Sequence, residues 1–251
     1  MLRILLALLC LALPARAEEI VAGLSQDRIA ITASFDGSEI LVYGAVKRDR
    51  PVPPGGPLQA IVTVEGPAHP VTVRRKSRVA GIWVNTESVD VDLAPSFYAV
   101  ASTGPLRDVL SQVDDLRYSV SVPRAIRSVG APMQIQDAQR FSEALIRIRT
   151  EEGRYSDKPG KVDLSEDTLL FTRFELPANL IEGDYKTRIF LTRDRAVVDL
   201  YEAVIHVQKV GLERWLYMLS QNQPLVYGLL SIFLAVAAGY AASAVFRFLR
   251  S

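Results

Sequence analysis

Residues 29–44, IAITASFDGSEILVYG, contain the pattern that decides the fold class. Apolar residues occupy every second position on both sides of a central Asp-Gly pair, at Ile29, Ile31, Ala33 and Phe35 and then at Ile40, Val42 and Gly44. Because successive side chains of a strand point to opposite faces, this spacing predicts two strands with one buried face each. Asp-Gly between alternating runs is typical of a hairpin turn, so we expect the two strands to pair around Asp36 and Gly37.

Strand-like spacing continues beyond this stretch, at 59–65, 71–76, 80–85 and 96–101. Residues 50–57, RPVPPGGP, form a loop, because proline and repeated glycine do not fit a central strand. Short strands at this density predict an immunoglobulin-like β-sandwich over residues 18–102. The chain lacks the Cys–Trp–Cys framework of a true immunoglobulin domain, so its topology stays open.

Helical spacing replaces strand spacing between residues 103 and 153. A first helix, starting at Pro105, is predicted by residues that share one helix face: Leu106, Val109, Leu110 and Val113. A second, between residues 135 and 151, is predicted by the stripe Phe141, Leu145 and Ile148. Strand patterns return at 169–176, 185–193 and 197–209, with a strand–turn–strand corner near 176–185. We therefore expect a helical connector, 103–153, and a second β unit, 154–210; whether the two β units share one core is left open.

The first seventeen residues have the pattern of a secretory signal peptide, with Arg3 before ten apolar residues and small residues at Ala15 and Ala17. The apolar run is too short to span a bilayer, which needs about 20 residues. Cleavage after Ala17 would leave Glu18 as the first residue.

A lipoprotein signal that uses Cys10 is the alternative, but Leu9 stands where a small residue is needed. Signal peptidase cleavage would remove Cys10, the only cysteine. A cysteine-free exported chain fits a bacterial envelope better than a eukaryotic secretory route.

The C-terminal end predicts a transmembrane helix over residues 224–246. The 22 residues from 225 to 246 carry no charge, which is enough to cross the hydrocarbon core. Arg247 and Arg250 follow, and no acidic residue lies after Glu213, so the positive-inside rule places the tail 247–251 in the cytoplasm. With an exported N-terminus, this predicts a single-pass inner-membrane protein with a periplasmic ectodomain.

Two features beside and within this helix suggest contacts with the bilayer or with other helices. Residues 211–223 predict an interfacial juxtamembrane helix, because its apolar residues share one face: Leu212, Trp215, Leu216 and Leu219. Ala235, Gly239 and Ser243 recur every four residues, which favours close helix packing in a homodimer or against a larger membrane partner. Small residues are also common in transmembrane helices, so this stripe has a neutral explanation too.

Charge and composition exclude several function classes. The formal net charge is +1, which gives no argument for nucleic-acid binding. All 28 acidic residues lie between residues 18 and 213, whereas the two ends carry only basic charge. With 49% hydrophobic and 23% charged residues, the chain is neither disordered nor a disulfide scaffold.

Residues with catalytic or metal-binding chemistry are few. His69 lies in a predicted turn and His206 in a predicted strand, and two separated histidines without cysteines are a poor zinc site. No Gly-x-Ser-x-Gly, phosphate-loop or dinucleotide motif is present in the sequence. Calcium could use Asp90, Asp92 or the turn at 182–184, but isolated oxygen ligands encode such a site poorly. We expect neither an enzyme nor a bound cofactor or metal.

One basic segment stands out from this background. It contains Arg74, Arg75, Lys76 and Arg78, followed by Trp83 and Asn85. These six residues are the candidate site for an anion or a partner, with Trp83 as an apolar anchor and Asn85 as a polar contact. The same charges could instead protect an open strand edge from aggregation, or bind anionic lipid headgroups. Arg75 cannot share a face with its neighbours Arg74 and Lys76 unless a bulge intervenes.

A series of short blocks completes the sequence picture: GLS at 23–25, FDGSE at 35–39, VRRK at 73–76, GIWVN at 81–85, PSFYAVAS at 95–102, FSEALI at 141–146, LPAN at 176–179 and GDY at 183–185. Together they resemble the Alph_Pro_TM family of putative transmembrane proteins over nearly all of the mature chain. Similar proteins carry Gly-Trp where this chain has Gly239-Tyr240. The resemblance implies a membrane topology and no particular reaction. It also implies a candidate partner, an exporter-type permease, through association with genes for permeases of sulfur oxyanions.

The sequence therefore favours a non-enzymatic periplasmic binding or accessory subunit, anchored by a single span and associated with a multi-span transporter or another envelope assembly. A structural envelope protein that positions its neighbours is the alternative. An enzyme whose site is assembled from residues that the sequence does not connect is a third hypothesis.

Overall fold

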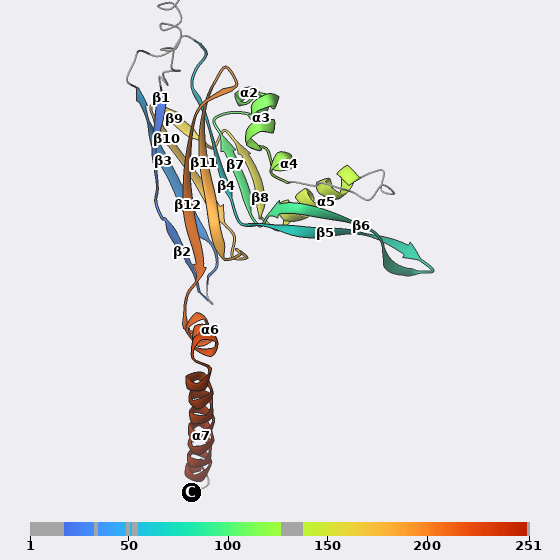
Figure 1. Cartoon of the computed structure of the whole chain (residues 1–251), viewed down its shortest axis with the longest axis vertical. Coiled ribbons are helices and arrows are strands. Elements are labelled where there is room, and N and C mark those ends of the chain that lie inside the picture. The colour runs from blue at the N-terminus through green and yellow to red at the C-terminus, as the bar shows by residue number, and fades with distance from the viewer. Residues whose placement is uncertain (1–17, 33–34, 49–50, 52–54, 127–137, 250–251) are drawn as a thin grey trace, which may run out of the picture. The chain divides into compact units, whose positions relative to one another are not determined.

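The computed structural model describes residues 18–32, 35–48, 51, 55–126 and 138–249, and its β-strands form two main sheets (Figure 1). The first sheet has the strand order β1 (Glu18–Leu24), β3 (Ser38–Arg48), β10 (Leu169–Leu176) and β9 (Asp163–Ser165). The second has the order β2 (Arg28–Ile31), β12 (Ala196–Lys209), β11 (Gly183–Arg193), β4 (Gln59–Glu65), β7 (Tyr98–Ser102) and β8 (Tyr155–Pro159). Strands β7 and β8 are parallel, whereas β4 pairs antiparallel with β7 and with β11.

This strand order is that of an immunoglobulin-like sandwich. Counted along the chain, the first sheet reads A-B-E-D, and the second reads G-F-C, with β2 as an extra edge strand beside G and with β7 and β8 at the positions of the C′ and C″ strands of variable-type domains. Tyr185 adds the tyrosine corner that such sandwiches share, because its hydroxyl donates to the Ile181 carbonyl oxygen at 2.9 Å. Burial raises the pKa of this tyrosine. The predicted mainly β fold is confirmed, and its topology, which the sequence left open, is resolved.

Strands from both predicted β units pair with each other in each sheet. Ile40 of β3 lies opposite Phe174 of β10, and Ile61 of β4 lies opposite Phe190 of β11. All four side chains are buried. The two predicted β units therefore contribute strands to the same two sheets and share one core.

The predicted hairpin around Asp36 and Gly37 is wrong, although both of its strands exist. Strand β2 belongs to the second sheet and β3 to the first, so the chain crosses between sheets here. Gly37 has a φ of +124°, and a Cβ at this position would lie 2.8 Å from the Leu176 carbonyl oxygen. The glycine therefore serves a close crossing over β10 and not a two-residue turn. Ala33, the third apolar residue of the first run, lies outside the described residues.

A layer of helices covers the outer face of the second sheet. It consists of α2 (Leu106–Val109), α3 (Gln112–Tyr118), α4 (Val122–Ala125) and α5 (Ala138–Glu151). Its core includes Tyr98, Val100 and Phe190 from the sheet, packed with Val109 and Leu145 from the helices. Strands β4 and β7 therefore have both faces buried, whereas β10 alternates buried and exposed side chains.

The helices differ in detail from their predicted stripes. The first predicted helix is divided into α2 and α3, because the Ser111 side chain caps α3 by accepting a hydrogen bond from the Asp114 amide at 3.1 Å. As a result Val113 is 69% exposed. In α5, Phe141 and Leu145 are buried as expected, but Ile148 is exposed and Ile146 packs against the core instead.

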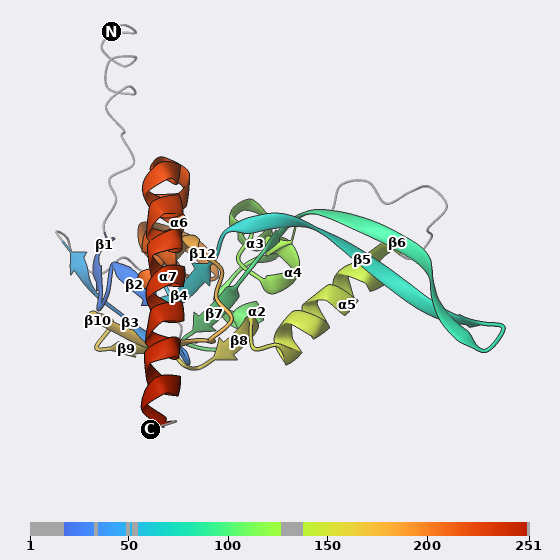
Figure 2. The ribbon, with the colours of Figure 1, turned by 90° about the horizontal axis from the view of Figure 1, so that it is seen from below.

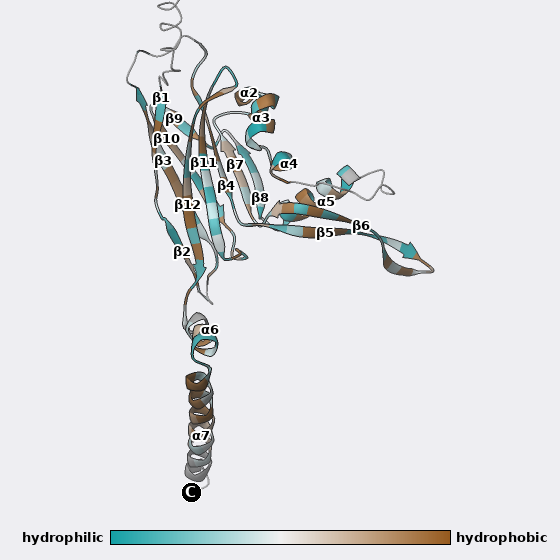
Figure 3. Ribbon diagram, viewed as in Figure 1, coloured by the Kyte–Doolittle hydropathy of each residue, from teal (hydrophilic) through white to brown (hydrophobic). Residues whose placement is uncertain are grey.

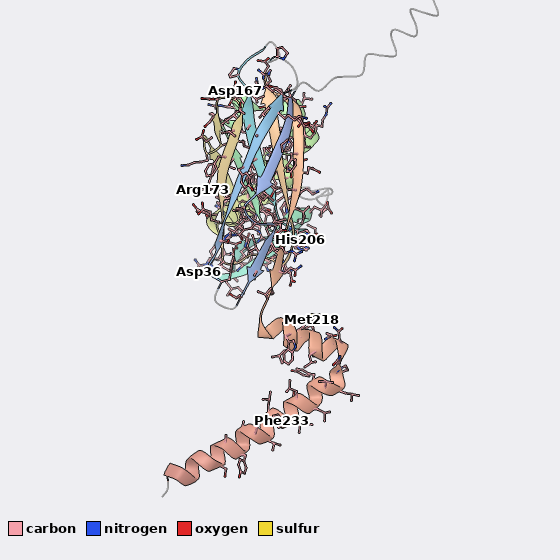
Figure 4. All side chains as sticks on the ribbon, turned by 90° about the vertical axis from the view of Figure 1, so that its left-hand side faces the viewer. Asp36, Asp167, Arg173, His206, Met218 and Phe233 are labelled. Carbon is pink, nitrogen blue, oxygen red and sulfur yellow. The ribbon has the colours of Figure 1, made fainter. Side chains whose placement is uncertain are left out.

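A buried ion cluster fastens the first strand to the end of the sandwich where Asp167 lies (Figure 4). The Glu18 carboxylate accepts from Arg48 Nε at 2.9 Å and from Arg193 Nη2 at 2.9 Å. Arg48 also donates to the Asp167 carbonyl oxygen, and Arg193 donates to the Gly56 carbonyl oxygen at 2.6 Å. Burial by itself would raise the pKa of Glu18, but the two guanidinium groups outweigh it and hold this pKa below its ordinary value. The cluster thus joins β1, β3 and β11 at one end.

The chain continues into two helices, α6 (Leu212–Asn222) and α7 (Pro224–Leu249). Within α7, residues 224–243 are long and apolar enough to cross a membrane. The part of α7 next to α6 is coloured as apolar in Figure 3, and Met218 and Phe233 mark the two helices in Figure 4. Helix α6 ends where the Gln223 amide donates to the Leu219 carbonyl oxygen at 2.9 Å, and Pro224 begins α7, where its missing N–H costs nothing.

Candidate functional site: the β5–β6 arm

Between β4 and β7 the chain forms a long hairpin that extends past α5, away from the sandwich (Figures 1 and 2). Its strands, β5 (Ala68–Val79) and β6 (Ile82–Pro95), form a separate two-stranded sheet, which we call the arm. Near the sandwich its apolar residues are part of the helical core, with Val91 and Ala94 fully or nearly buried. Farther out, residues 80–83 and 85–88 are all exposed. The arm is therefore held at its base and exposed to solvent over its outer half.

Two contacts hold the arm to the rest of the domain. Tyr155 donates from its hydroxyl to the carbonyl oxygen of Pro95, where β6 ends, at 2.7 Å, and burial raises the pKa of Tyr155 to about 12. The Arg75 guanidinium lies over the ring of Phe141 of α5, 4.8 Å from its centroid. Arg75 also pairs with Glu87 across the arm, with 2.8 Å between Nη1 and Oε2. Helix α5 and β8 thus hold the arm in a defined direction.

The Arg75 contacts predict a local effect of the Arg75→Ala substitution. A partly exposed cation–π pair and an exposed ion pair each contribute about 0.5–1 kcal/mol, so the sandwich should remain folded. We expect faster amide hydrogen exchange in β5, β6 and α5, and unchanged exchange in β3 and β10. Lys76→Ala is the matched control and should leave the exchange of α5 unchanged. Equal exchange of α5 in both variants would show that Arg75 does not hold the arm.

Five of the six candidate residues lie on one face of the arm. Lys76 is opposite Asn85 and Arg78 is opposite Trp83, whereas Arg75 is opposite Glu87. The register shifts between Arg75 and Lys76, so Thr86 is an extra residue on β6. Because the extra residue is on β6, the side chains of β5 still alternate regularly. Arg75 therefore points to the opposite face from Arg74 and Lys76. We call the shared face, formed by Arg74, Lys76, Arg78, Trp83 and Asn85, the arm face.

The tip of the arm is apolar. Ala80 and Gly81 both have positive φ, 50° and 88°, which forms a two-residue turn that matches the twist of the strands. Beside the turn, Val79 is 51% exposed, Ile82 is 65% exposed and Trp83 is 68% exposed. Val79 and Ile82 face each other on one side of the ribbon, and Trp83 lies on the other side with Arg78. The tip therefore exposes apolar side chains on both of its faces.

The family model described as putative transmembrane protein (Alph_Pro_TM) matches residues 19–248 of the chain. The chain belongs to this family. The range of the Alph_Pro_TM match includes the sandwich, the arm and nearly all of α7, and it establishes a membrane protein with one candidate span near its C-terminus. Among curated proteins, none matches the chain.

The histidines and one of the carboxylates that the sequence singled out in this Alph_Pro_TM protein lie apart from one another. His206 Nδ1 lies 2.7 Å from Asp184 Oδ1 on adjacent strands, and His69 is exposed in β5. Asp90 accepts a hydrogen bond from the Thr72 hydroxyl at 2.6 Å. In the described part of the chain, no group of three or more His, Cys, Asp or Glu residues could hold a metal ion.

Surface hollows lie along the sandwich and beside the helices. One of them, with a volume of about 540 Å³, is lined by residues of β8 and the end of β10, including Asp157, Lys158 and Glu175. Burial raises the pKa of Asp157. Lys158 Nζ and Glu175 Oε2 are 3.8 Å apart, so these two charges largely compensate each other within the hollow.

Sequence reasoning missed the buried ion cluster of Glu18, Arg48 and Arg193, and it also missed a second buried arginine. Arg188 donates from Nη1 to the Tyr118 carbonyl oxygen at 2.6 Å and lies 3.7 Å from Glu65. Its strand position is that of an ordinary solvent-facing residue, and only the helical layer above β11 buries it. The sequence therefore carried no local signal for this contact.

The three small residues of α7 lie on an open surface. Ala235, Gly239 and Ser243 are exposed, and a Cβ built on Gly239 meets no atom within 4 Å. This face is accessible to another helix in the membrane.

Proposed function

We propose that this protein is a non-enzymatic accessory subunit of a membrane assembly, held in the bacterial inner membrane by α7. In this proposal the sandwich lies in the periplasm and the short tail in the cytoplasm, as the signal-peptide pattern of residues 1–17 and the basic tail predict. Cleavage after Ala17 would leave Glu18 first, so the mature chain would begin at the ion cluster with Arg48 and Arg193.

The arm is the observation that carries this proposal. A long exposed ribbon is costly to leave open, because its unpaired edges and exposed apolar tip favour association. Here the fold instead fixes the base of the arm with Tyr155 and Phe141 and leaves the cationic arm face accessible. Such a surface suits the binding of an anionic partner, with Trp83 as the apolar anchor. The alternative of a charged edge that only prevents aggregation accounts for the cations but not for the exposed tip.

The proposed partner of α7 is a multi-span transporter of the exporter-permease type. The open face at Ala235, Gly239 and Ser243 would let a transporter helix approach closely, and van der Waals contact would then hold the two proteins together. A homodimer through the same face is the second possibility, and the experiment below separates the two.

The test is crosslinking in native membranes followed by mass spectrometry. We expect wild type to recover a multi-span transporter, and the double variant Ala235→Leu, Gly239→Leu to lose at least ten-fold of that recovery by steric exclusion. Ala237→Leu is the matched control, because at 100° per residue it lies on the opposite side of α7. Recovery of this chain alone would favour the homodimer, and transporter recovery that is equal in all three proteins would contradict docking through this face.

A further inference from the structure

We propose that the tip of the arm inserts into the anionic phospholipid surface of the membrane that holds α7. The inference rests on the proposed function, in which the arm is the contact surface of the ectodomain, and it names the partner of that surface. Its basis is the distribution of apolar and cationic side chains along the arm.

The apolar residues of the tip point to both sides of the ribbon. Val79 and Ile82 lie on one side and Trp83 on the other, and each is more than half exposed. A flat protein surface would cover only one side and leave the other in water. Lipid surrounds an inserted tip on all sides, so it removes all three side chains from water at once. Tryptophan also favours the headgroup boundary, where its ring is apolar and its N–H remains hydrogen-bonded.

Behind the apolar tip, the cations of the arm face lie at the distance at which lipid headgroups would surround an inserted tip. Arg78 is level with Trp83, Lys76 lies two residues farther back and Arg74 another two. At about 3.3 Å per residue, Lys76 is about 10 Å behind Val79. A tip buried about 5–10 Å deep would therefore place Lys76 and Arg74 among the headgroups, with Arg78 extending its side chain towards them. The acidic residue at this level of the arm is Glu87, and its charge is paired with Arg75 at 2.8 Å, so Arg74, Lys76 and Arg78 leave the outer arm with a net positive charge towards anionic lipid.

The structure of the arm also limits how deep it can insert. Its two strands pair with each other up to Val79 and Ile82, but the outer edge of each strand faces no other strand of its sheet. Unpaired backbone groups are costly in the hydrocarbon core, so only the turn and the residues beside it can enter it. Behind the tip, Ser77 and Thr86 share a hydrogen bond at 3.0 Å, and Asn85 is exposed beside Lys76. This polar band would stop insertion at the headgroup level.

The membrane that holds α7 is the favoured surface because of the short connection to it. Residues 210–223, which include α6, are the whole connection between the end of β12 and the start of α7. The sandwich is thereby confined near that bilayer, and the high effective concentration of lipid favours it over any other membrane.

The test uses the fluorescence of Trp83 in the full-length chain. The chain has 2 tryptophans, so Trp215→Phe leaves Trp83 as the only reporter. The protein is placed in nanodiscs that contain brominated acyl chains, with either phosphatidylglycerol and phosphatidylcholine or phosphatidylcholine alone. We expect blue-shifted Trp83 emission and strong bromine quenching in the anionic discs, and weak quenching in the zwitterionic discs.

Charge variants show whether the cations drive insertion. The triple variant Arg74→Gln, Lys76→Gln, Arg78→Gln should reduce the insertion equilibrium about 100-fold in anionic discs, since each cation near an anionic surface contributes about a factor of five. The matched control Arg107→Gln, Arg124→Gln, Lys186→Gln removes the same charge from exposed positions outside the arm and should insert as the parent does.

Three results would overturn the inference. Trp83 emission typical of water in both kinds of disc would exclude insertion. A blue shift without bromine quenching would indicate a protein contact, and quenching only by separately added brominated vesicles would indicate another membrane. The crosslinking of α7 is read independently. If a transporter is captured while Trp83 stays in water, the proposed function holds and the lipid contact is excluded. If Trp83 is inserted but no transporter is captured, the lipid contact holds and docking to a transporter is contradicted.

Discussion

Replacing Glu18 with alanine is expected to lower the free energy of unfolding by about 3–5 kcal/mol, because removing one partner of a buried ion cluster leaves the other charges uncompensated. The Glu18 side chain is 2% exposed, and the substitution would strand Arg193, which is 7% exposed, together with Arg48. Urea unfolding of the full chain in detergent, followed by the circular dichroism of its strands, measures the loss. Glu19→Ala is the matched control. Its 3.8 Å ion pair with Lys47 is exposed, so the expected loss is below about 1 kcal/mol.

The pH dependence gives a second measurement on the same cluster. The pKa of Glu18 is lowered in the folded chain, so its charge stabilises the fold at every pH above the ordinary value of 4.5. This stabilisation is lost as the pH falls through the lowered, folded-state pKa. The difference in unfolding free energy between wild type and Glu18→Gln should therefore be constant near neutral pH and shrink below 4.5. A difference that grows on acidification would contradict the described cluster.

Phe190→Ala is expected to cost about 3–5 kcal/mol in the free energy of unfolding. The Phe190 side chain is fully buried in the core between the second sheet and the helices, and its ring meets Tyr118 of α3 edge-on at 5.7 Å. The alanine variant would leave a cavity where the two layers meet. Because one core joins them, we expect the helices and strands to unfold in a single shifted transition, measured by thermal unfolding with hydrogen exchange.

The control for this substitution is Phe171→Ala on the outer face of β10. Phe171 is 37% exposed and its ring lies 5.2 Å from the Arg173 guanidinium, so its removal should cost less than about 1.5 kcal/mol. If Phe190→Ala accelerated exchange in α3 and α5 while the sandwich kept its wild-type stability, the helical layer would be a separate folding unit.

The sequence predicted strands correctly where one face of the strand is buried and the other is exposed to water. Strand β10 was predicted within its observed bounds, because Leu170, Thr172 and Phe174 alternate with exposed neighbours. It underestimated β6, whose outer half is exposed on both faces and carries no alternation to detect. The Asp36-Gly37 pair correctly indicated a position where the backbone needs glycine. It did not indicate the partner of β3, because β3 pairs with β10, about 130 residues later in the chain, where Ile40 lies opposite Phe174.

The candidate site followed the same division. The alternation of side chains along β5 predicted that Arg75 lies on the opposite face from Arg74 and Lys76, and the register of the arm agrees. Placing Arg75 over Phe141 required knowing that α5 lies beside the arm, which no local pattern encodes. The buried partners of Glu18 and Arg188 come from strands and helices distant in the chain, so neither could be read from sequence spacing.

The arrangement of the insertions supports the proposed role of the arm. The arm follows the C strand and the helices follow the C′ strand, so the two additions are consecutive insertions into the second sheet. Helix α5, from the second addition, packs on the first and fixes its direction through Phe141. Two neighbouring insertions thus build and brace one protruding surface, while the sandwich serves as the scaffold.

The most direct test of the account is photocrosslinking in native membranes from the tip of the arm. A benzophenone amino acid placed at position 83 is compared with one at Tyr43, an exposed aromatic position on β3. We predict adducts with lipid or with a membrane partner from position 83, and only background from position 43. Adducts from position 43, with none from position 83, would contradict the assignment of the arm as the contact surface of the ectodomain.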